Sequence, residues 1–255
     1  MRIEIHPDRP AAARAAAEAV AAVLRERPDA VLGLATGGTM VPVYEALVAL
    51  HRAGLSFAGA ASVNLDEYVG LPPGHPQSYR RYMERHLFGH VDIDPARTHL
   101  PPGGTDPGEA ARRYRETLSA LGPPDIQLLG LGRNGHIGFN EPGSPFGSGT
   151  RPVRLSASTL RANARFFGEG ERQPEQAITM GIATILRARR ILLVACGTAK
   201  AGAVRAMVEG PVTEDVPATA LRGHGDAAAI LDEESAGALG TAARDAAGKE
   251  PPRPH

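Results

Sequence analysis

One polar segment on a glycine-rich turn, residues 130–143, has side chains suited to proton transfer. It contains Asn134, His136, Asn140 and Glu141. A histidine changes charge near neutral pH, and a carboxylate a few residues away can orient its imidazole ring. Many histidines are structural, but one in a polar loop beside a ligand is a candidate general acid or base. The segment therefore predicts that His136 and Glu141 transfer protons together.

Two further acidic residues, Asp66 and Glu67, follow the apolar run 60–65. Partial burial at the end of a strand raises the pKa of a carboxyl group, which suits a general base. The alternative is a structural role, in which the carboxylate caps a helix or accepts other hydrogen bonds. These residues alone leave both alternatives open.

The loop after the apolar run 31–35 has the composition of a phosphate-binding turn. Its glycines let backbone N–H groups approach an anion, its threonines add hydroxyl donors, and the following helix points its positive end inward. The residues concerned are Thr36, Gly37, Gly38 and Thr39. The loop matches neither the dinucleotide fingerprint nor the P-loop, and a tight turn without a ligand is the alternative.

Two basic residues are candidates for further phosphate contacts. Lys200 begins an expected helix after a strand and a glycine, where a cation opposes the helix dipole unless an anion lies between them. Arg165 lies next to Phe166 and Phe167 in the sequence. The alternatives are a solvated lysine and an arginine whose aliphatic stem packs on the surface.

Short apolar runs alternate with helical patterns along the chain. This alternation indicates a parallel sheet covered by helices, and continuous apolar runs are typical of strands buried on both faces. The expected strands are 2–6, 31–35, 60–65, 126–131, 191–196 and 227–231. The expected helices include 11–27, 41–51, 78–88, 107–121 and 200–208. We therefore predict an α/β fold, a single doubly wound, Rossmann-like domain of three layers with a mainly parallel sheet.

The polar segments all follow expected strands, and ligands of such sheets bind beyond the carboxyl ends of the strands. Together they predict one site with a phosphate-binding loop, basic residues, a carboxylate base and a histidine–glutamate pair. That set suits ring opening of a sugar phosphate, followed by abstraction of a proton next to a carbonyl or imine. No metal or other cofactor is expected, because the sequence contains no HExxH, no paired cysteines and no redox motif.

The amino-acid composition disfavours nucleic acids and membranes as binding partners. The 28 basic and 28 acidic residues give a formal net charge of zero, which disfavours a nucleic-acid partner. The single cysteine, Cys196, excludes an internal disulfide and is consistent with a reducing compartment. No signal peptide and no apolar run of membrane-spanning length is found, so we expect a cytoplasmic protein without a membrane partner.

The expected domain covers residues 1–240. Residues 241–255 are rich in alanine, proline and charged residues, and are expected to form a disordered tail. The sequence leaves the oligomeric state open.

The sequence resembles the glucosamine-6-phosphate deaminase family over nearly its whole length, from about Ile3 to about Glu234. The most specific segments are 63–68 (VNLDEY), 71–79 (LPPGHPQSY) and 132–142 (GRNGHIGFNEP). The resemblance implies the α/β fold and conversion of glucosamine 6-phosphate to fructose 6-phosphate and ammonia.

The resemblance also implies roles for individual residues. Asp66 would take the proton from C2 and return it to C1. His136 would open the pyranose ring, supported by Glu141 and Asn134. The implied phosphate-binding positions are Gly37, Gly38, Thr39, Arg165 and Lys200.

Some positions depart from the family pattern. Met40 stands where a proline is common, and the usual proline after His224 is absent. Members of the family with an allosteric activator site have a lysine at the position of Val153. Allosteric activation of the enzyme through such a site is therefore not expected.

Three other functions remain as alternatives. A 6-phosphogluconolactonase shares the fold, but is expected to lack the run 64–68 and to differ after the turn 134–136. A galactosamine-6-phosphate deaminase uses the same chemistry and is not distinguished by the sequence. A sugar-phosphate sensor of a transcription regulator needs a DNA-binding module, whereas only one strand and one helix are expected before Val31.

Overall fold

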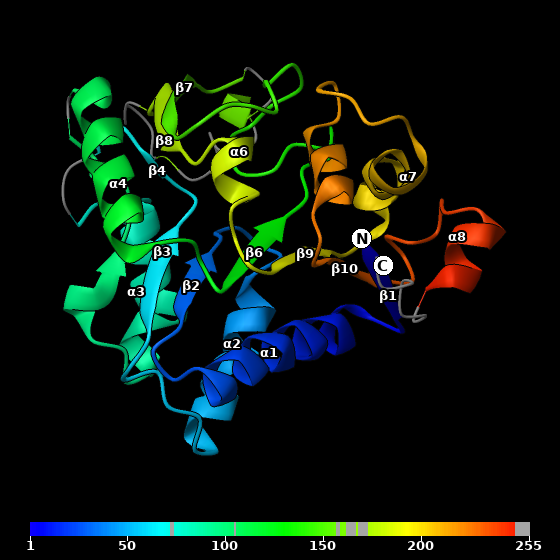
Figure 1. Ribbon diagram of the computed structural model, residues 1–255, viewed down its shortest axis with the longest axis horizontal. Coiled ribbons are helices and arrows are strands. Elements are labelled where there is room, and N and C mark those ends of the chain that lie inside the picture. Colours follow the sequence, from blue (N-terminus) through cyan, green and yellow to red (C-terminus); the bar gives the residue numbers. More distant parts are fainter. Residues whose placement is uncertain (72–73, 105, 157–158, 162–166, 168–172, 248–255) are drawn as a thin grey trace.

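A computed structural model describes residues 1–71, 74–104, 106–156, 159–161, 167 and 173–247 (Figure 1). Its largest element is a seven-stranded sheet with the order β1-β10-β9-β6-β2-β3-β5, in which all paired strands are parallel. The strands are β1 Arg2–His6, β2 Val31–Leu34, β3 Ala61–Asn64, β5 Thr98–His99, β6 Ile126–Gly130, β9 Ile191–Ala195 and β10 Ala227–Asp232. The predicted mainly parallel α/β fold is therefore confirmed.

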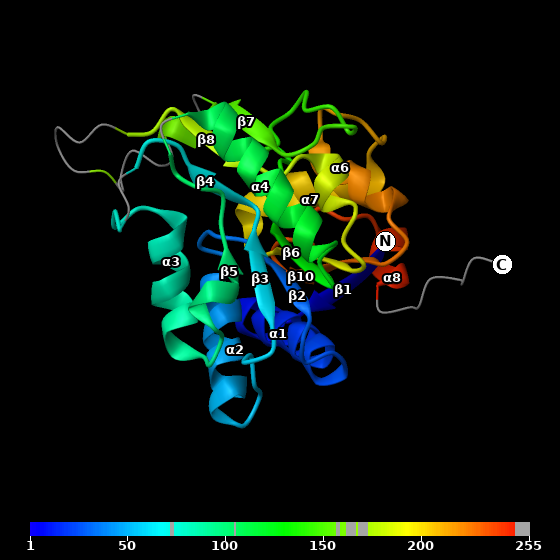
Figure 2. The same ribbon diagram turned by 60° about the vertical axis from the view of Figure 1, so that its left-hand side comes forward.

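Helices cover both faces of this sheet. In Figures 1 and 2, α1 and α2 lie on one side of it, and α4 and α7 lie on the other. The α-helices are α1 Arg9–Glu26, α2 Val41–Arg52, α3 Tyr79–His86, α4 Pro107–Leu121, α6 Ile182–Ile185, α7 Ala201–Glu209 and α8 Thr241–Ala246. Every residue of β3, β9 and β10 is buried, which explains the continuous apolar runs Ile191–Ala195 in β9 and 227–231 in β10. In β3 the buried residues include the polar Ser62 and Asn64.

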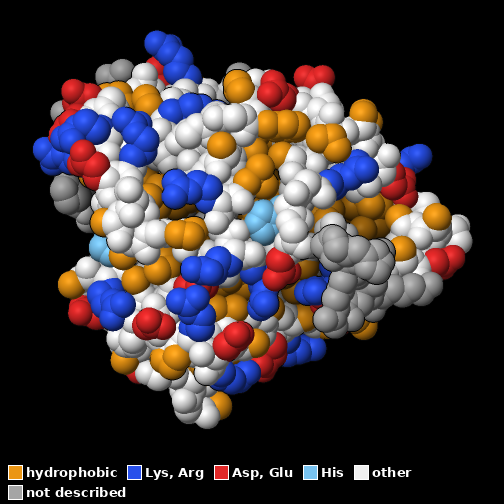
Figure 3. Space-filling model, viewed as in Figure 1, with side chains coloured by type: hydrophobic (Ala, Val, Ile, Leu, Met, Phe, Trp, Pro, Cys, Tyr) orange, Lys and Arg blue, Asp and Glu red, His pale blue; other side chains and the backbone are white. Residues whose placement is uncertain are grey.

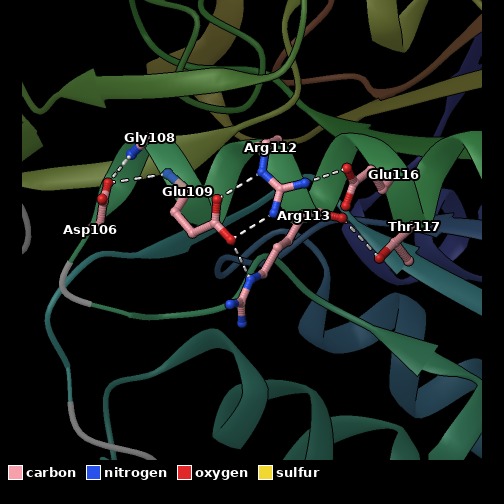
Figure 4. Close-up of polar contacts among 7 residues, drawn as sticks. All are labelled: Asp106, Gly108, Glu109, Arg112, Arg113, Glu116 and Thr117. Atoms are coloured by element: carbon pink, nitrogen blue, oxygen red, sulfur yellow. Dashed lines mark hydrogen bonds and ion pairs between the residues drawn. The ribbon is translucent and has the colours of Figure 1, made fainter.

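The capping residues explain where the helices begin. Asp8 accepts a hydrogen bond from the N–H of Ala11 at 2.7 Å and starts α1. Asp106 caps α4 in the same way through Gly108 and Glu109, at 2.9 and 3.1 Å (Figure 4). The predicted bounds of α4, residues 107–121, match the observed helix.

The exposed side of α4 carries a row of ion pairs (Figure 4). Glu109 pairs with Arg112 and Arg113 at 2.7 and 2.8 Å, and Arg112 also pairs with Glu116 at 2.5 Å. Exposed pairs of this kind contribute little to folding because water screens them. Basic and acidic side chains are also interspersed over the face seen in Figure 3, in keeping with the zero net charge.

A second, smaller sheet was not predicted. It is antiparallel, with the order β4-β8-β7, and consists of β4 Asp66–Tyr68, β7 Arg151–Arg154 and β8 Gln176–Thr179. The expected strand 60–65 ends at Asn64, and after Leu65 the chain enters β4 of the small sheet. One residue thus separates a strand of the large sheet from a strand of the small one.

The C-terminal segment was expected to be disordered from residue 241. Thr241–Ala246 instead form α8, which lies close to the N-terminal strand in Figure 1. Residues 248–255 of that segment lie outside the described residues. Among the described helices, none is long and apolar enough to cross a membrane.

Candidate active site

The candidate site lies where the order of strands in the large sheet changes direction. From β2, the chain continues to β3 on one side, and it later returns to β6 on the other side of β2. Such a point leaves a crevice at the carboxyl ends of the two strands, where ligands of this architecture bind. The glycine-rich loop follows β2 and the segment with His136 follows β6, so the topology brings two of the predicted segments together.

The imidazole ring of His136 packs closely against Gly132. A Cβ atom added to Gly132 would lie 2.4 Å from three atoms of this ring, so no larger residue fits there. The N–H of Gly132 donates to the carbonyl of His136 at 2.9 Å, and the N–H of His136 donates to Asn134 Oδ1 at 3.3 Å. The loop is therefore folded back so that the imidazole lies against its own backbone.

His136 and Glu141 face each other as predicted. His136 Nδ1 lies 3.4 Å from Glu141 Oε2, is buried, and has no hydrogen bond within the described part of the chain. A carboxylate facing Nδ1 favours the tautomer that has its proton on this nitrogen. In this arrangement Nε2 is left to exchange a proton with a ligand.

Glu141 receives several other hydrogen bonds. Asn134 Nδ2 donates to Oε2 at 2.7 Å, and the hydroxyls of Thr159 and Ser156 donate to Oε1 at 2.7 and 3.2 Å. Burial acts to raise the pKa of Glu141, but His136 and the hydrogen bonds from Asn134 and Thr159 outweigh it and lower this pKa to about 2. Glu141 is therefore a permanent anion at neutral pH.

Asp66 occupies a different environment at the start of β4. It is 5% exposed, and no hydrogen bond to its carboxylate is found within the described residues. Burial raises its pKa to about 8, with a further contribution from the neighbouring charge of Glu67. The predicted rise in the pKa of a carboxyl group at this edge of the sheet is thus present at Asp66.

The carboxylate of Asp66 lies beside the loop that contains His136. A Cβ atom on Gly138 would be 3.4 Å from Asp66 Oδ2 and 3.1 Å from Thr179 Oγ1. Asp66 and Thr179 are also paired across β4 and β8. A residue larger than glycine at 138 would fill the space next to the carboxylate, and the φ of +57° there also favours glycine.

Glu67 has the structural role that the sequence left open for this pair. Its Oε1 accepts hydrogen bonds from the N–H groups of Tyr68 and Tyr79, both at 2.9 Å, and its Oε2 accepts one from Arg80 at 3.0 Å. The carboxylate thus satisfies N–H groups at the start of α3. Burial raises the pKa of Glu67, and these hydrogen bonds act against that rise.

The glycine-rich loop is a tight turn between β2 and α2. The φ of Gly37 is +110°, a value that L side chains rarely adopt, and a Cβ on Gly37 or Gly38 would meet no atom within 4 Å. The N–H of Met40 donates to the carbonyl of Gly37 at 3.0 Å and closes the turn. Within the described residues, the N–H groups of Gly38 and Thr39 have no acceptor. The turn therefore presents free donors to open space.

Lys200 follows β9 and reaches the end of the neighbouring strand. Its Nζ donates to the carbonyl of Leu131, directly after β6, at 2.6 Å. Burial lowers the pKa of Lys200, and the nearby charge of Arg133 acts in the same direction. The ammonium group therefore lies at the ligand edge of the sheet, whereas the second predicted basic residue, Arg165, lies outside the described residues.

Several site residues were not found from the sequence. Tyr68, Tyr79 and Phe139 pack against one another, with ring centroids 4.8 to 6.2 Å apart, next to the carboxylate of Asp66 on β4. Thr159 contacts Glu141 across 18 positions in the sequence. No periodic pattern signals such contacts, although Tyr68 and Tyr79 belong to the segments that carried the family resemblance.

Within the part of the chain that the structure describes, no group of three or more His, Cys, Asp or Glu side chains could hold a metal ion. The arrangement can instead transfer protons with a buried carboxyl group and a histidine, beside free N–H donors and a lysine.

Both the sequence and the structure of the chain are similar to those of known proteins. The model of the family of glucosamine-6-phosphate isomerases and 6-phosphogluconolactonases matches residues 9–229. Glucosamine-6-phosphate deaminase of Geobacillus sp. (strain WCH70) is 52% identical over 222 residues, covering 86% of this chain and 88% of that protein. The enzyme of the same name from Shewanella loihica is 51% identical over 241 residues, covering 94% of this chain and 90% of that protein.

The solved structures of two related enzymes are also similar to this chain. A monomeric glucosamine-6-phosphate deaminase superposes with a TM-score of 0.91 and 46% identity, covering 94% of this chain and 100% of that one. The 6-phosphogluconolactonase of Trypanosoma brucei shares the fold at a TM-score of 0.74 and 20% identity, covering 94% and 98%. The chain belongs to the family of glucosamine-6-phosphate isomerases and 6-phosphogluconolactonases.

Proposed function

We propose that this protein is an enzyme that converts glucosamine 6-phosphate to fructose 6-phosphate and ammonia. Relatives that are about half identical over most of their length bear the name of this activity. The observation that carries the proposal is a buried carboxyl group, Asp66, whose pKa is raised to about 8 beside the loop of a histidine–glutamate pair. A base that removes a carbon-bound proton needs a raised pKa, and a ring-opening pair needs a group that exchanges protons near neutrality.

Binding of the phosphate group is the first step. The free N–H groups of Gly38 and Thr39 and the ammonium group of Lys200 supply donors and positive charge for a phosphate dianion. Thr36 and Arg165 remain predicted contacts of the same group. Phosphate binding at this edge of the sheet directs the sugar ring toward the neighbouring loop after β6.

Ring opening follows at His136. The imidazole Nε2 takes the proton of the anomeric hydroxyl and passes it to the ring oxygen as the bond between C1 and that oxygen breaks, which gives the open-chain aldehyde. Glu141 stabilises the positive charge that develops on the imidazole, because it stays ionised at all pH values above about 2. Asn134 holds the carboxylate in place through its hydrogen bond of 2.7 Å.

Proton transfer between carbons is the role of Asp66. The carboxylate removes the proton from C2, and the C–H electron pair forms the C1–C2 double bond of an enolamine. The carbonyl pair of C1 moves to O1, which takes a proton from the ammonium group of the substrate. The same carboxyl group then returns the proton to C1, which gives a 2-imino sugar. Water adds to C2 of this imine and ammonia leaves, so the products are fructose 6-phosphate and ammonia. Because a sugar phosphate does not cross membranes unaided, we also propose that the reaction takes place in the cytoplasm.

The test is a product assay with three substrates. We expect equal amounts of ammonia and fructose 6-phosphate from glucosamine 6-phosphate, and the same yield with a chelator present. Galactosamine 6-phosphate tests preference at C4, and 6-phosphogluconolactone tests the hydrolase alternative. Lactone hydrolysis without ammonia, or tight binding of the amino sugar without turnover, would contradict the proposal.

A further inference from the structure

Two side chains from outside the glycine-rich loop contact the carbonyl groups of its glycines. The Tyr82 hydroxyl, on α3, donates to the carbonyl of Gly37 at 2.8 Å. The Arg9 guanidinium, at the first position of α1, donates through Nη2 to the carbonyl of Gly38. The two contacts thus come from helices that are far apart in the sequence and converge on consecutive residues of one turn.

These contacts fix the direction of the N–H groups that follow. A trans peptide is planar, so its C=O and N–H bonds point in opposite directions, and the chain has no cis peptide bond. Holding the carbonyl of Gly37 toward Tyr82 turns the N–H of Gly38 the other way. Holding the carbonyl of Gly38 toward Arg9 does the same for the N–H of Thr39. Both N–H groups are thus turned away from the contacts made by Arg9 and Tyr82, and successive N–H groups without an acceptor can form an anion-binding concavity.

The guanidinium of Arg9 also places a positive charge beside this loop. It is exposed and forms no ion pair with a carboxylate within the described residues. Its positive charge also acts on the thiol of Cys196, directly before the loop that leads to Lys200. The guanidinium therefore lies near both loops that are proposed to bind phosphate.

We propose that Arg9 and Tyr82 are positioning residues of the phosphate site: they hold the peptide planes of residues 37–39 so that two N–H groups face the phosphate of the substrate. Arg9 also adds a positive charge to the glycine-rich loop. The inference rests on the proposed function only in naming a sugar phosphate as the ligand. It assigns Arg9 and Tyr82 no part in proton transfer.

The test separates binding from chemistry. Arg9→Ala is expected to raise the KM for glucosamine 6-phosphate about tenfold, with kcat within about twofold of the wild type, because the variant loses a charge-assisted hydrogen bond that orients the loop. Competitive inhibition by inorganic phosphate is expected to weaken by the same factor. Tyr82→Phe removes one neutral hydrogen bond and is expected to raise KM about threefold.

Control variants make the result specific. Arg14→Ala removes the same charge from an exposed position of α1 that does not touch the loop, and is expected to leave KM and phosphate inhibition unchanged. Arg9→Lys keeps the charge and is expected to recover part of the lost affinity. If Arg9→Ala and Arg14→Ala behave alike, or if only the melting temperature or kcat of Arg9→Ala changes, the inference is wrong.

Calorimetric titration with inorganic phosphate distinguishes failure of this inference from failure of the proposed function. Weaker phosphate binding by Arg9→Ala supports the inference even if the wild type produces no ammonia. Equal phosphate binding by wild type and Arg9→Ala overturns it even if the wild type is an active deaminase.

Discussion

Strand β4 and the loop after β6 each contribute one carboxylate to the proposed active site, and their surroundings differ. Asp66 on β4 is buried, and no hydrogen bond to its carboxylate is found within the described residues, which raises its pKa to about 8. Glu141 in the loop accepts hydrogen bonds from Asn134, Ser156 and Thr159, and its pKa is lowered to about 2. Near neutral pH, therefore, one group exchanges protons while the other keeps its charge.

The difference in pKa gives the two carboxyl groups different proposed roles. A carboxyl group with a pKa near the working pH can both remove and return a proton, as the transfer from C2 to C1 requires. A carboxylate with a very low pKa cannot return a proton, but it stabilises an imidazolium ion. Two residues of similar chemistry thus acquire separate proposed roles from their burial, hydrogen bonds and neighbouring charges.

The largest effect is expected from removing the proposed base, Asp66, which tests whether its role differs from that of Glu141. Asp66→Asn keeps the shape of the side chain but abolishes proton transfer, so kcat should fall about 10³- to 10⁴-fold. Inhibition by inorganic phosphate should stay close to that of the wild type, because Asp66 does not belong to the phosphate loop. Loss of phosphate binding with turnover retained would show that the residue has been assigned the wrong role.

A smaller effect is expected from neutralising the other carboxylate. Glu141→Gln leaves a neutral amide beside His136 Nδ1, so the developing imidazolium loses its counter-charge, and kcat should fall about 10²-fold. Glu116→Gln on the exposed side of α4 makes the same chemical change away from the site (Figure 4) and should leave steady-state kinetics unaltered. Equal kinetics for the two variants would refute the role of Glu141.

The smallest effect concerns stability rather than rate. A carboxyl group whose pKa is raised on folding stabilises the protein most at pH values below its unfolded value, 3.8, and this contribution is lost as pH rises toward about 8. Asp66→Asn removes that dependence. The melting temperature of the variant, relative to wild type, should therefore increase by several degrees between pH 5 and pH 9. A difference that does not change with pH would mean that the pKa of Asp66 is not raised.

Most of the large sheet could be predicted because several of its strands are encoded by continuous apolar runs, such as 191–196, which contains β9. Its two-residue edge strand β5, Thr98–His99, was not predicted, because two polar residues give no strand pattern. The small sheet could not be predicted either. β7 is the four-residue segment Arg-Pro-Val-Arg, whose charges and proline give no sign of a strand, and β4 consists of three polar or aromatic residues. These strands are determined by tertiary pairing rather than by local sequence.

The candidate site was partly predictable for a related reason. Asp66, His136 and Glu141 were identified because they are ionisable residues in segments that directly follow expected strands, at the edge of the sheet where ligands bind. The partner Thr159 was missed because a threonine in a polar segment carries no distinguishing signal. The carbonyl contacts of Arg9 and Tyr82 were missed because they depend on how α1 and α3 pack beside the loop.

The single residue between the two sheets has a mechanical consequence. Leu65 donates through its N–H to Leu34 at the end of β2 and accepts through its carbonyl from Met180 after β8, at 3.1 and 2.7 Å. Asp66 therefore belongs to the small sheet, whereas the glycine-rich loop follows β2 of the large one. In the proposed reaction, the distance between the phosphate-binding turn and the carboxylate of Asp66 therefore depends on the connection at Leu65. A shift of one sheet relative to the other would change that distance without changing either group.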